Sequence, residues 1–199
     1  MALRMDWKVA SDGTVRVEQP GAEGKASIAD ALRIAPADVQ LAPGETRELA
    51  LTLEPPAAFP VAPAVYHSGF LIRAVPLTGV VSFGPAATVV VYDTVGAPRA
   101  HVTVTQLHVR SPAAGSAVLS ARILNDGVAY ARLTGRTMLR RDGQVVADQT
   151  DSIPVLFAGE GRVFTKILPA LQAGDYDVSF TLDYGGPTLI QGTTKVRVR

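Results

Sequence analysis

Alternation of apolar and polar residues, the pattern of half-buried β-strands, recurs along the whole chain. The alternating runs are residues 14–18, 47–53, 101–109, 176–182 and 194–198. In the fourth of them Tyr176, Val178 and Phe180 fall on one face, and in the second Leu49, Leu51 and Leu53 do so. The pattern predicts an all-β chain built from many short strands.

Turn sequences separate these runs at short intervals. They are Asp12-Gly13, Pro43-Gly44, Asn125-Asp126-Gly127, Asp142-Gly143, Ala173-Gly174 and Gly185-Gly186-Pro187. Asp-Gly between alternating runs indicates a hairpin, because both central residues of a type I′ turn need a positive φ. The best helix candidate, residues 26–31, is too short to be stable alone, and Pro36 follows it. Short strands with frequent turns are typical of a sandwich or barrel.

The two halves of the chain can be laid over each other. Leu41-Ala42-Pro43-Gly44-Glu45-Thr46-Arg47 matches Leu156-Phe157-Ala158-Gly159-Glu160-Gly161-Arg162 at Leu, Gly, Glu and Arg. We expect Gly44 and Gly159 in the turns, and the Glu and Arg of each copy at the exposed start of a strand, where an ion pair contributes little. The repeat predicts two tandem immunoglobulin-like sandwiches, residues 1–97 and 98–199, joined near Pro98.

Each half then reaches a tyrosine, Tyr66 or Tyr176, with Phe70 or Phe180 four residues later. Such a tyrosine either forms the tyrosine corner of Greek-key sandwiches, bonding back to the upstream backbone, or is an ordinary strand aromatic. The turn before Tyr176 favours the corner at that position. For Tyr66 both interpretations stay open.

The repeat also shows a difference between the halves. About 40 residues of strand-like sequence, 101–141, precede Asp142-Gly143, whereas the first half reaches Asp12-Gly13 after eleven residues. The first sandwich therefore lacks its opening strands, which leaves an apolar face and a sheet edge uncovered. We expect an N-terminally truncated version of a longer protein, whose missing start would have carried any signal peptide. The alternative is that another molecule covers the face.

Composition excludes several classes of function. The net charge is +1 with both signs scattered, so no basic cluster points to nucleic acid. Without cysteine there is no disulfide, thiolate metal site or cysteine nucleophile. No apolar stretch reaches the roughly 18–20 residues that span a membrane, and residues 1–7 contain no signal core.

No catalytic motif stands out. His67, His101 and His108 lie in strand-like runs without a ligand spacing. Ser68 follows His67 on an alternating strand, so the two side chains point to opposite faces and cannot meet as nucleophile and base. We therefore expect no enzyme, no catalytic residue and no cofactor.

Three aspartates, Asp142, Asp148 and Asp151, lie near one hairpin but lack the spacing of a calcium loop. We interpret them as solvated hairpin residues and expect no metal site.

Val89, Val90, Val91 and Tyr92 form the most apolar strand candidate. We favour a strand that is buried on both faces. The functional alternative is an edge strand that pairs with a protein client.

Residues 32–51 resemble the first domain of periplasmic pilus chaperones, the PapD-like proteins, which show a short strand, a proline, an apolar pair, Pro-Gly and an alternating strand. Residues 70–76 resemble the family's next long strand, which also ends in proline, and residues 82–92 match more loosely. The resemblance implies a periplasmic or extracellular protein that binds its client by strand addition.

One departure from the family concerns two basic residues that hold the client's carboxylate. One lies on the first strand, which is absent here, and the other on the last strand of the first domain. Residues 82–92 contain no Lys or Arg, and Arg99 lies beyond the motif position. We therefore expect either a PapD-like assembly protein or chaperone, or a structural or adhesive immunoglobulin-like module of a cell-envelope protein.

Overall fold

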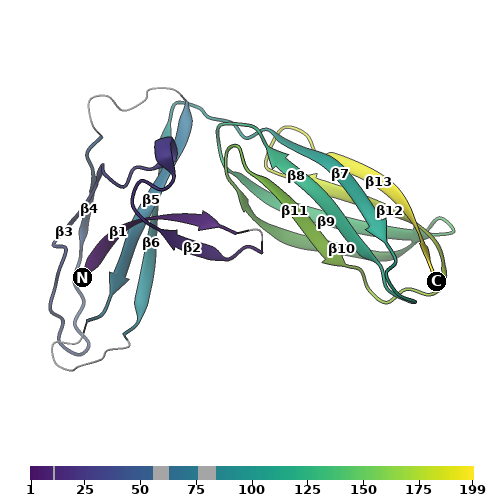
Figure 1. Cartoon of the computed structure of the whole chain (residues 1–199), viewed down its shortest axis with the longest axis horizontal. Helices are drawn as coiled ribbons and strands as arrows, with labels where there is room; N and C mark the ends of the chain where they lie inside the picture. The colour runs from purple at the N-terminus through teal and green to yellow at the C-terminus, as the bar shows by residue number, and fades with distance from the viewer. Residues whose placement is uncertain (11, 56–62, 76–83) are drawn as a thin grey trace. The chain divides into compact units, whose positions relative to one another are not determined.

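The computed structural model describes residues 1–10, 12–55, 63–75 and 84–199 (Figure 1). These residues are almost entirely antiparallel β-structure with one short 3-10 helix, η1 (Gly24–Ala26). The chain divides into two compact units. Unit 1 contains Met1–Ala10 and Val15–Ala97, and unit 2 contains Pro98–Arg199 together with residues 12–14.

Unit 2 is a sandwich of two antiparallel sheets. Its strands are β7 (Val102–Arg110), β8 (Val118–Asn125), β9 (Ala131–Arg141), β10 (Gln144–Leu156), β11 (Gly161–Ile167), β12 (Gly174–Asp183) and β13 (Ile190–Val198). One sheet has the order β10-β9-β12-β13 and the other the order β11-β8-β7. Because the chain crosses between the sheets after β8 and β10 and again after β11, the strand order is that of an immunoglobulin-like sandwich.

The core of unit 2 lies between these two sheets. In β12 the side chains of Tyr176, Val178, Phe180 and Leu182 are buried and alternate with polar neighbours, as the sequence predicted. Phe164 of β11 stacks on Phe180 with 5.7 Å between ring centroids. Burying a large apolar side chain of this kind contributes about 1.5–3 kcal/mol.

Unit 1 repeats one of these sheets strand for strand. Its strands are β1 (Ala2–Val9), β2 (Val15–Glu18), β3 (Leu32–Ala35), β4 (Ala50–Leu53), β5 (Ala64–Arg73) and β6 (Ala86–Val95). The order β2-β1-β5-β6 reproduces β10-β9-β12-β13, and β3 pairs with β4 in a second, two-stranded sheet. This confirms that the chain is all-β with two immunoglobulin-like units.

The two opening strands are absent from unit 1, as predicted. Within the described residues nothing corresponds to β7 and β8 (Figure 1). The expected strand at residues 47–53 is also shorter than predicted, because β4 begins only at Ala50. In unit 2 the equivalent strand, β11, begins directly after its turn because β8 pairs with it along its whole length.

The segment between β2 and β3 also differs from the expectation. Of residues 26–31, the best helix candidate, only Ala26 is helical, as the last residue of the short 3-10 helix, and residues 27–31 are not. The backbone amide of Ile28 instead reaches the β5 carbonyl of His67 at 3.4 Å. The segment is held to the sheet by contacts across the fold, which local propensity does not describe.

Candidate functional site

The repeated turn has the same geometry in both units. Gly44 and Gly159 have φ of +78° and +77°, which a glycine adopts without strain. In each copy the Glu side chain accepts a 2.9 Å hydrogen bond from the backbone amide three residues before it. These bonds join Ala42 to Glu45 and Phe157 to Glu160. The recurring Glu therefore closes the turn and supports its fold.

The recurring Arg behaves differently in the two units. The Arg47 side chain is 61 % exposed, as expected, but the Arg162 side chain is only 4 % exposed, so the prediction of an exposed position was wrong there. Arg162 donates to the backbone carbonyl of Pro154 at 2.9 Å. Beside it β8 ends at Asn125, whose amide donates to the carbonyl of Glu160 at 2.9 Å. The strand that flanks Arg162 has no described equivalent beside Arg47.

Strand β6 lies at the edge of its sheet. It pairs with β5 along its whole length, and no other described strand pairs with it. Val89, Val90 and Tyr92 are 40 %, 44 % and 36 % exposed, and Val91 is half-buried. The expectation that this strand is buried on both faces was therefore wrong. The candidate residues instead form an exposed apolar edge.

The equivalent edge strand of unit 2, β13, is polar. It carries Lys195 and Arg197, whose side chains are 87 % and 79 % exposed. Strand β6 contains neither Lys, Arg nor Pro, its one charged residue is Asp93, and its pairing with β5 has no bulge. Lysine, proline and bulges are the features that protect natural edge strands from pairing with other chains. Unit 1 therefore has an unprotected edge where unit 2 has a protected one.

A groove of about 680 Å³ opens on another side of unit 1. Its apolar lining includes Met5, Leu32, Ile34 and Phe70, and its rim includes Arg4, Glu18, Arg33 and Arg73. The groove lies among β1, β2, β3 and β5. It contains no group of three potential metal ligands, a finding that holds for all the described residues.

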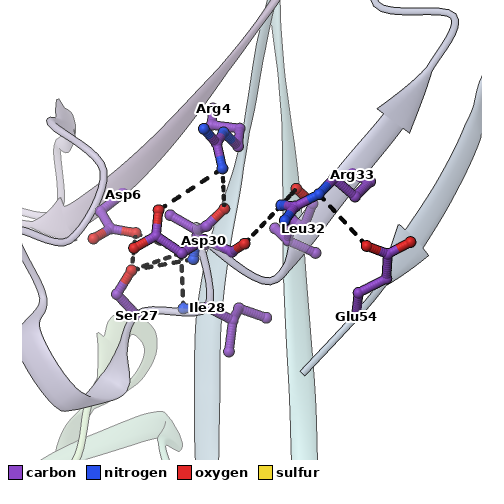
Figure 2. Close-up of polar contacts among 10 residues, drawn as sticks. Arg4, Asp6, Ser27, Ile28, Asp30, Leu32, Arg33 and Glu54 are labelled. Atoms are coloured by element: carbon purple, nitrogen blue, oxygen red, sulfur yellow. Dashed lines mark hydrogen bonds and ion pairs between the residues drawn. The ribbon is translucent and has the colours of Figure 1, made fainter. Parts of the chain in front are cut away.

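A buried polar network joins the sheet of unit 1 to the segment before β3 (Figure 2). The carboxylate of Asp6, which is fully buried, accepts hydrogen bonds from the hydroxyls of Ser68 and Ser27 and, at 3.2 Å, from the amide of Glu23. The Ser68 hydroxyl in turn accepts from the amide of Ile28 at 3.2 Å. Because Asp6 and Ser68 are both 0 % exposed, neither reaches a substrate, and the network acts on the fold.

Exposed ion pairs extend this network along β3 (Figure 2). Arg4 lies 3.7 Å from Asp30, and Arg33 lies 3.6 Å from Glu54. Arg33 also donates to the backbone carbonyl of Leu32 at 3.0 Å. Such exposed pairs contribute about 0–1 kcal/mol each, so they orient β3 more than they stabilise it.

His67 and Ser68 lie on opposite faces of β5, as predicted. Ser68 faces the Asp6 network, whereas the His67 ring packs 5.3 Å from Trp7 and 6.3 Å from Tyr92 between ring centroids. The two side chains therefore do not meet as a nucleophile and its base.

The aspartates near the second hairpin are held by cations of the protein itself. Asp148 accepts two hydrogen bonds from Arg136, at 2.8 and 2.5 Å, and this interaction lowers the pKa of the Asp148 carboxyl. Asp151 pairs with Lys166, and Asp142 lies 3.7 Å from Arg141. The three carboxylates therefore have separate partners.

The two tyrosines occupy equivalent positions on β5 and β12. The Tyr176 hydroxyl donates to the carbonyl of Gln172, four residues upstream, at 2.8 Å. This is the geometry of a tyrosine corner. Tyr66 is equally buried, at 4 % exposure, and packs with Phe70 in the core of unit 1.

No family model matches this chain, and no curated protein matches it. Among solved structures it is similar to the C-terminal domain of Wzt, with 16 % identity, a TM-score of 0.40, and coverage of 51 % of this chain and 75 % of that one. The CARDB domain of the Pyrococcus furiosus PF1109 protein, in complex with di-metal ions, matches at 19 % identity and a TM-score of 0.36, over 51 % and 93 % of the two chains.

A β-glucuronidase from Bacteroides uniformis matches at 22 % identity and a TM-score of 0.39, over 50 % of this chain and 13 % of the enzyme. These matches cover about half of this chain and, for the enzyme, a small part of its length. They carry no argument about function, and the fold assignment rests on the strand order described above.

Proposed function

We propose that this chain is a non-enzymatic, exported protein-binding module that binds an extended segment of a protein client by strand addition to β6 of unit 1. The observation that carries the proposal is the unprotected apolar edge of β6, compared with the charged edge of β13. In strand addition main-chain hydrogen bonds supply affinity, and alternating side chains supply specificity.

The side chains of β6 suit both parts of this interaction. In the β5–β6 register Val89 lies opposite Phe70 and Val91 opposite Ser68, so these valines share the face of the unit 1 core. Val90 and Tyr92 lie on the other face. A client strand paired with β6 would therefore extend the sheet of unit 1. Its side chains would make apolar contacts with β6 on both faces of that sheet.

The PapD-like role is narrower than this proposal. Strand β6 carries no Lys or Arg that would hold a client's terminal carboxylate. We therefore propose binding through the backbone edge and apolar side chains, without a carboxylate anchor. The periplasmic or extracellular location belongs to the same proposal and is supported by the resemblance of residues 32–76 to pilus chaperones.

A structural or adhesive immunoglobulin-like module of the cell envelope is the second candidate. The missing basic residue and the complete sandwich of unit 2 favour it. In this case β6 would pair with the edge of another folded domain, whereas a chaperone would pair with an extended client segment.

Site-specific photocrosslinking tests the proposal. We expect p-benzoylphenylalanine at Thr88 of β6 to crosslink a protein client in the source organism, and the same group at Thr193 of β13 to give no such product. The double variant Val90→Lys, Tyr92→Arg gives β6 the charges that β13 has. We expect it to lower the yield at Thr88 by about tenfold or more, because a partner strand would have to bury them.

Mass spectrometry of the product separates the two candidates. Crosslinks to an extended segment of the partner support a chaperone, and crosslinks to the edge of a folded domain support a structural module. Equal yields from Thr88 and Thr193, or an unchanged yield in the double variant, would contradict strand addition at β6.

A further inference from the structure

A second uncovered edge in unit 1 belongs to β4. Strand β4 pairs with β3 on one side, and no described strand pairs with it on the other. Residues 46–49, which lead into it, are not in a strand. Leu51 is 45 % exposed although it shares a face with the core residue Leu32.

Unit 2 shows what covers the same edge when the sandwich is complete. Residues 46–53 correspond to 161–168 when the two repeated turns are aligned. In unit 2, β8 pairs with this stretch in antiparallel register, from Gly161 opposite Leu124 to Ile167 opposite Val118. The inward-facing residues of β8, Leu119, Ala121 and Ile123, are all fully buried.

The C-terminal end of β8 is hydrogen-bonded to the repeated turn of unit 2. The backbone of Asn125 donates to the carbonyl of Glu160 at 2.9 Å and accepts from the amide of Gly159 at 2.8 Å. Its side-chain amide donates to the carbonyl of Leu156 at 3.0 Å. The equivalent groups of unit 1 are the carbonyls of Glu45 and Leu41 and the amide of Gly44, in a turn of the same geometry.

The acidic residues of unit 1 favour a basic strand at the free edge of β4. Arg122 of β8 lies opposite Val163 in the register, and the residue of unit 1 equivalent to Val163 is the exposed Glu48. A strand with a basic residue at that position would place it across from Glu48. Residues 1–97 as a whole carry seven Lys and Arg against ten Asp and Glu, which also favours a basic occupant.

We propose that the free edge of β4, with residues 46–49, binds an extended polypeptide segment of the same chemistry as β8, in the place that β8 occupies in unit 2. The segment runs antiparallel to residues 46–53. It has apolar residues at every second position, a basic residue opposite Glu48, and an Asn at its C-terminal end that binds the Leu41–Glu45 turn. This site is separate from β6 and rests on a different observation.

A fluorescent synthetic peptide with the sequence of Val118–Asn125 tests the site by anisotropy titration of the full 199-residue chain. We expect saturable binding that Glu48→Lys in the protein weakens about threefold to tenfold, since cross-strand charge pairs have effects of this size. A peptide carrying Arg122→Glu should bind the unaltered protein equally poorly. It should recover affinity for the Glu48→Lys protein to within about twofold.

Hydrogen exchange of the same complexes locates the peptide. We expect new protection at residues 46–53. Absence of binding at the solubility limit of the peptide, or affinities that do not depend on the charge at position 48, would overturn the inference. Protection at Ala86–Val95 alone would overturn it while supporting strand addition at β6, so the two proposals fail separately.

Discussion

Replacing Asp6 with alanine is expected to lower the free energy of unfolding of unit 1 by about 3 kcal/mol. The carboxylate accepts hydrogen bonds from Ser27, Ser68 and the backbone of Glu23 in a fully buried position. Without it the fully buried Ser68 hydroxyl and the part-buried donors of Ser27 and Glu23 lose their acceptor, which costs more than the hydrogen bonds themselves contribute. The segment before β3 would then lose its attachment to the sheet.

Denaturant unfolding monitored by the fluorescence of Trp7 measures this change, because Trp7 is the single tryptophan of the chain and is buried in unit 1. Asp30→Ala is the matched control, since Asp30 is 95 % exposed, and it should leave the midpoint nearly unchanged. Asp6→Asn keeps an acceptor oxygen and should cost less than Asp6→Ala. Equal midpoints for the Asp6→Ala and Asp30→Ala proteins would show that the network does not hold unit 1 together.

Replacing Asn125 with alanine is expected to destabilise unit 2 by about 3 kcal/mol. The Asn125 side chain is fully buried and donates to the carbonyls of Ala129 and Leu156 at 2.8 and 3.0 Å. It also accepts from the backbone amides of Gly127 and His101, at 3.1 and 3.3 Å. Alanine leaves these backbone groups without partners at the point where β8 meets the repeated turn.

Calorimetry of the full chain measures this effect. We expect the unfolding temperature of unit 2 to fall by about 10 °C or more, the shift that about 3 kcal/mol produces in a domain of this size. Asp126→Ala, at the exposed neighbouring position, is the control and should change the transition little. A shift in the Asn125→Ala protein no larger than in this control would contradict the structural role of Asn125.

The duplicated architecture was predictable because it depends on local signals. The repeated Gly-Glu turn requires a positive φ at one position, and the hairpin at Asp142-Gly143 shows positive φ at both residues, 51° and 78°. The offset between the two copies also predicted that the opening strands of unit 1 are missing. These features need only the order of residues along the chain.

Features that depend on distant strands were not predictable. Apolar and polar residues alternate from Arg47 onward, yet β4 starts only at Ala50. Alternation in the sequence does not reveal whether a partner strand is present to pair with the residues before Ala50. Arg162 is buried and Arg47 exposed, although their local sequences match. Asp6 shares one face of its strand with Arg4 and Lys8, a pattern typical of a solvent-facing surface, and only the fold shows that a later segment covers it.

The exposure of the candidate site, residues 89–92 of β6, also depends on distant strands and was not predictable. A continuous apolar run such as residues 89–92 favours a strand that is buried on both faces, and nothing in the run itself reveals that β6 is an exposed edge. The position of β6 at the end of its sheet decides between them, and strand order is a property of the whole fold. The difference between the apolar edge of β6 and the charged edge of β13 could be recognised only once the fold showed that the two strands are equivalent.

Hydrogen exchange of the full chain without any partner tests most directly the central claim, that unit 1 presents uncovered strands where unit 2 is complete. The comparison is between the backbone amides of residues 46–52 and those of the equivalent strand, Gly161–Ile167. We expect residues 46–49 to exchange almost without protection, and the β11 amides bonded to β8 to exchange at least about 100-fold more slowly. Equal protection of the two stretches would mean that the edge in unit 1 is already paired, and would contradict the account.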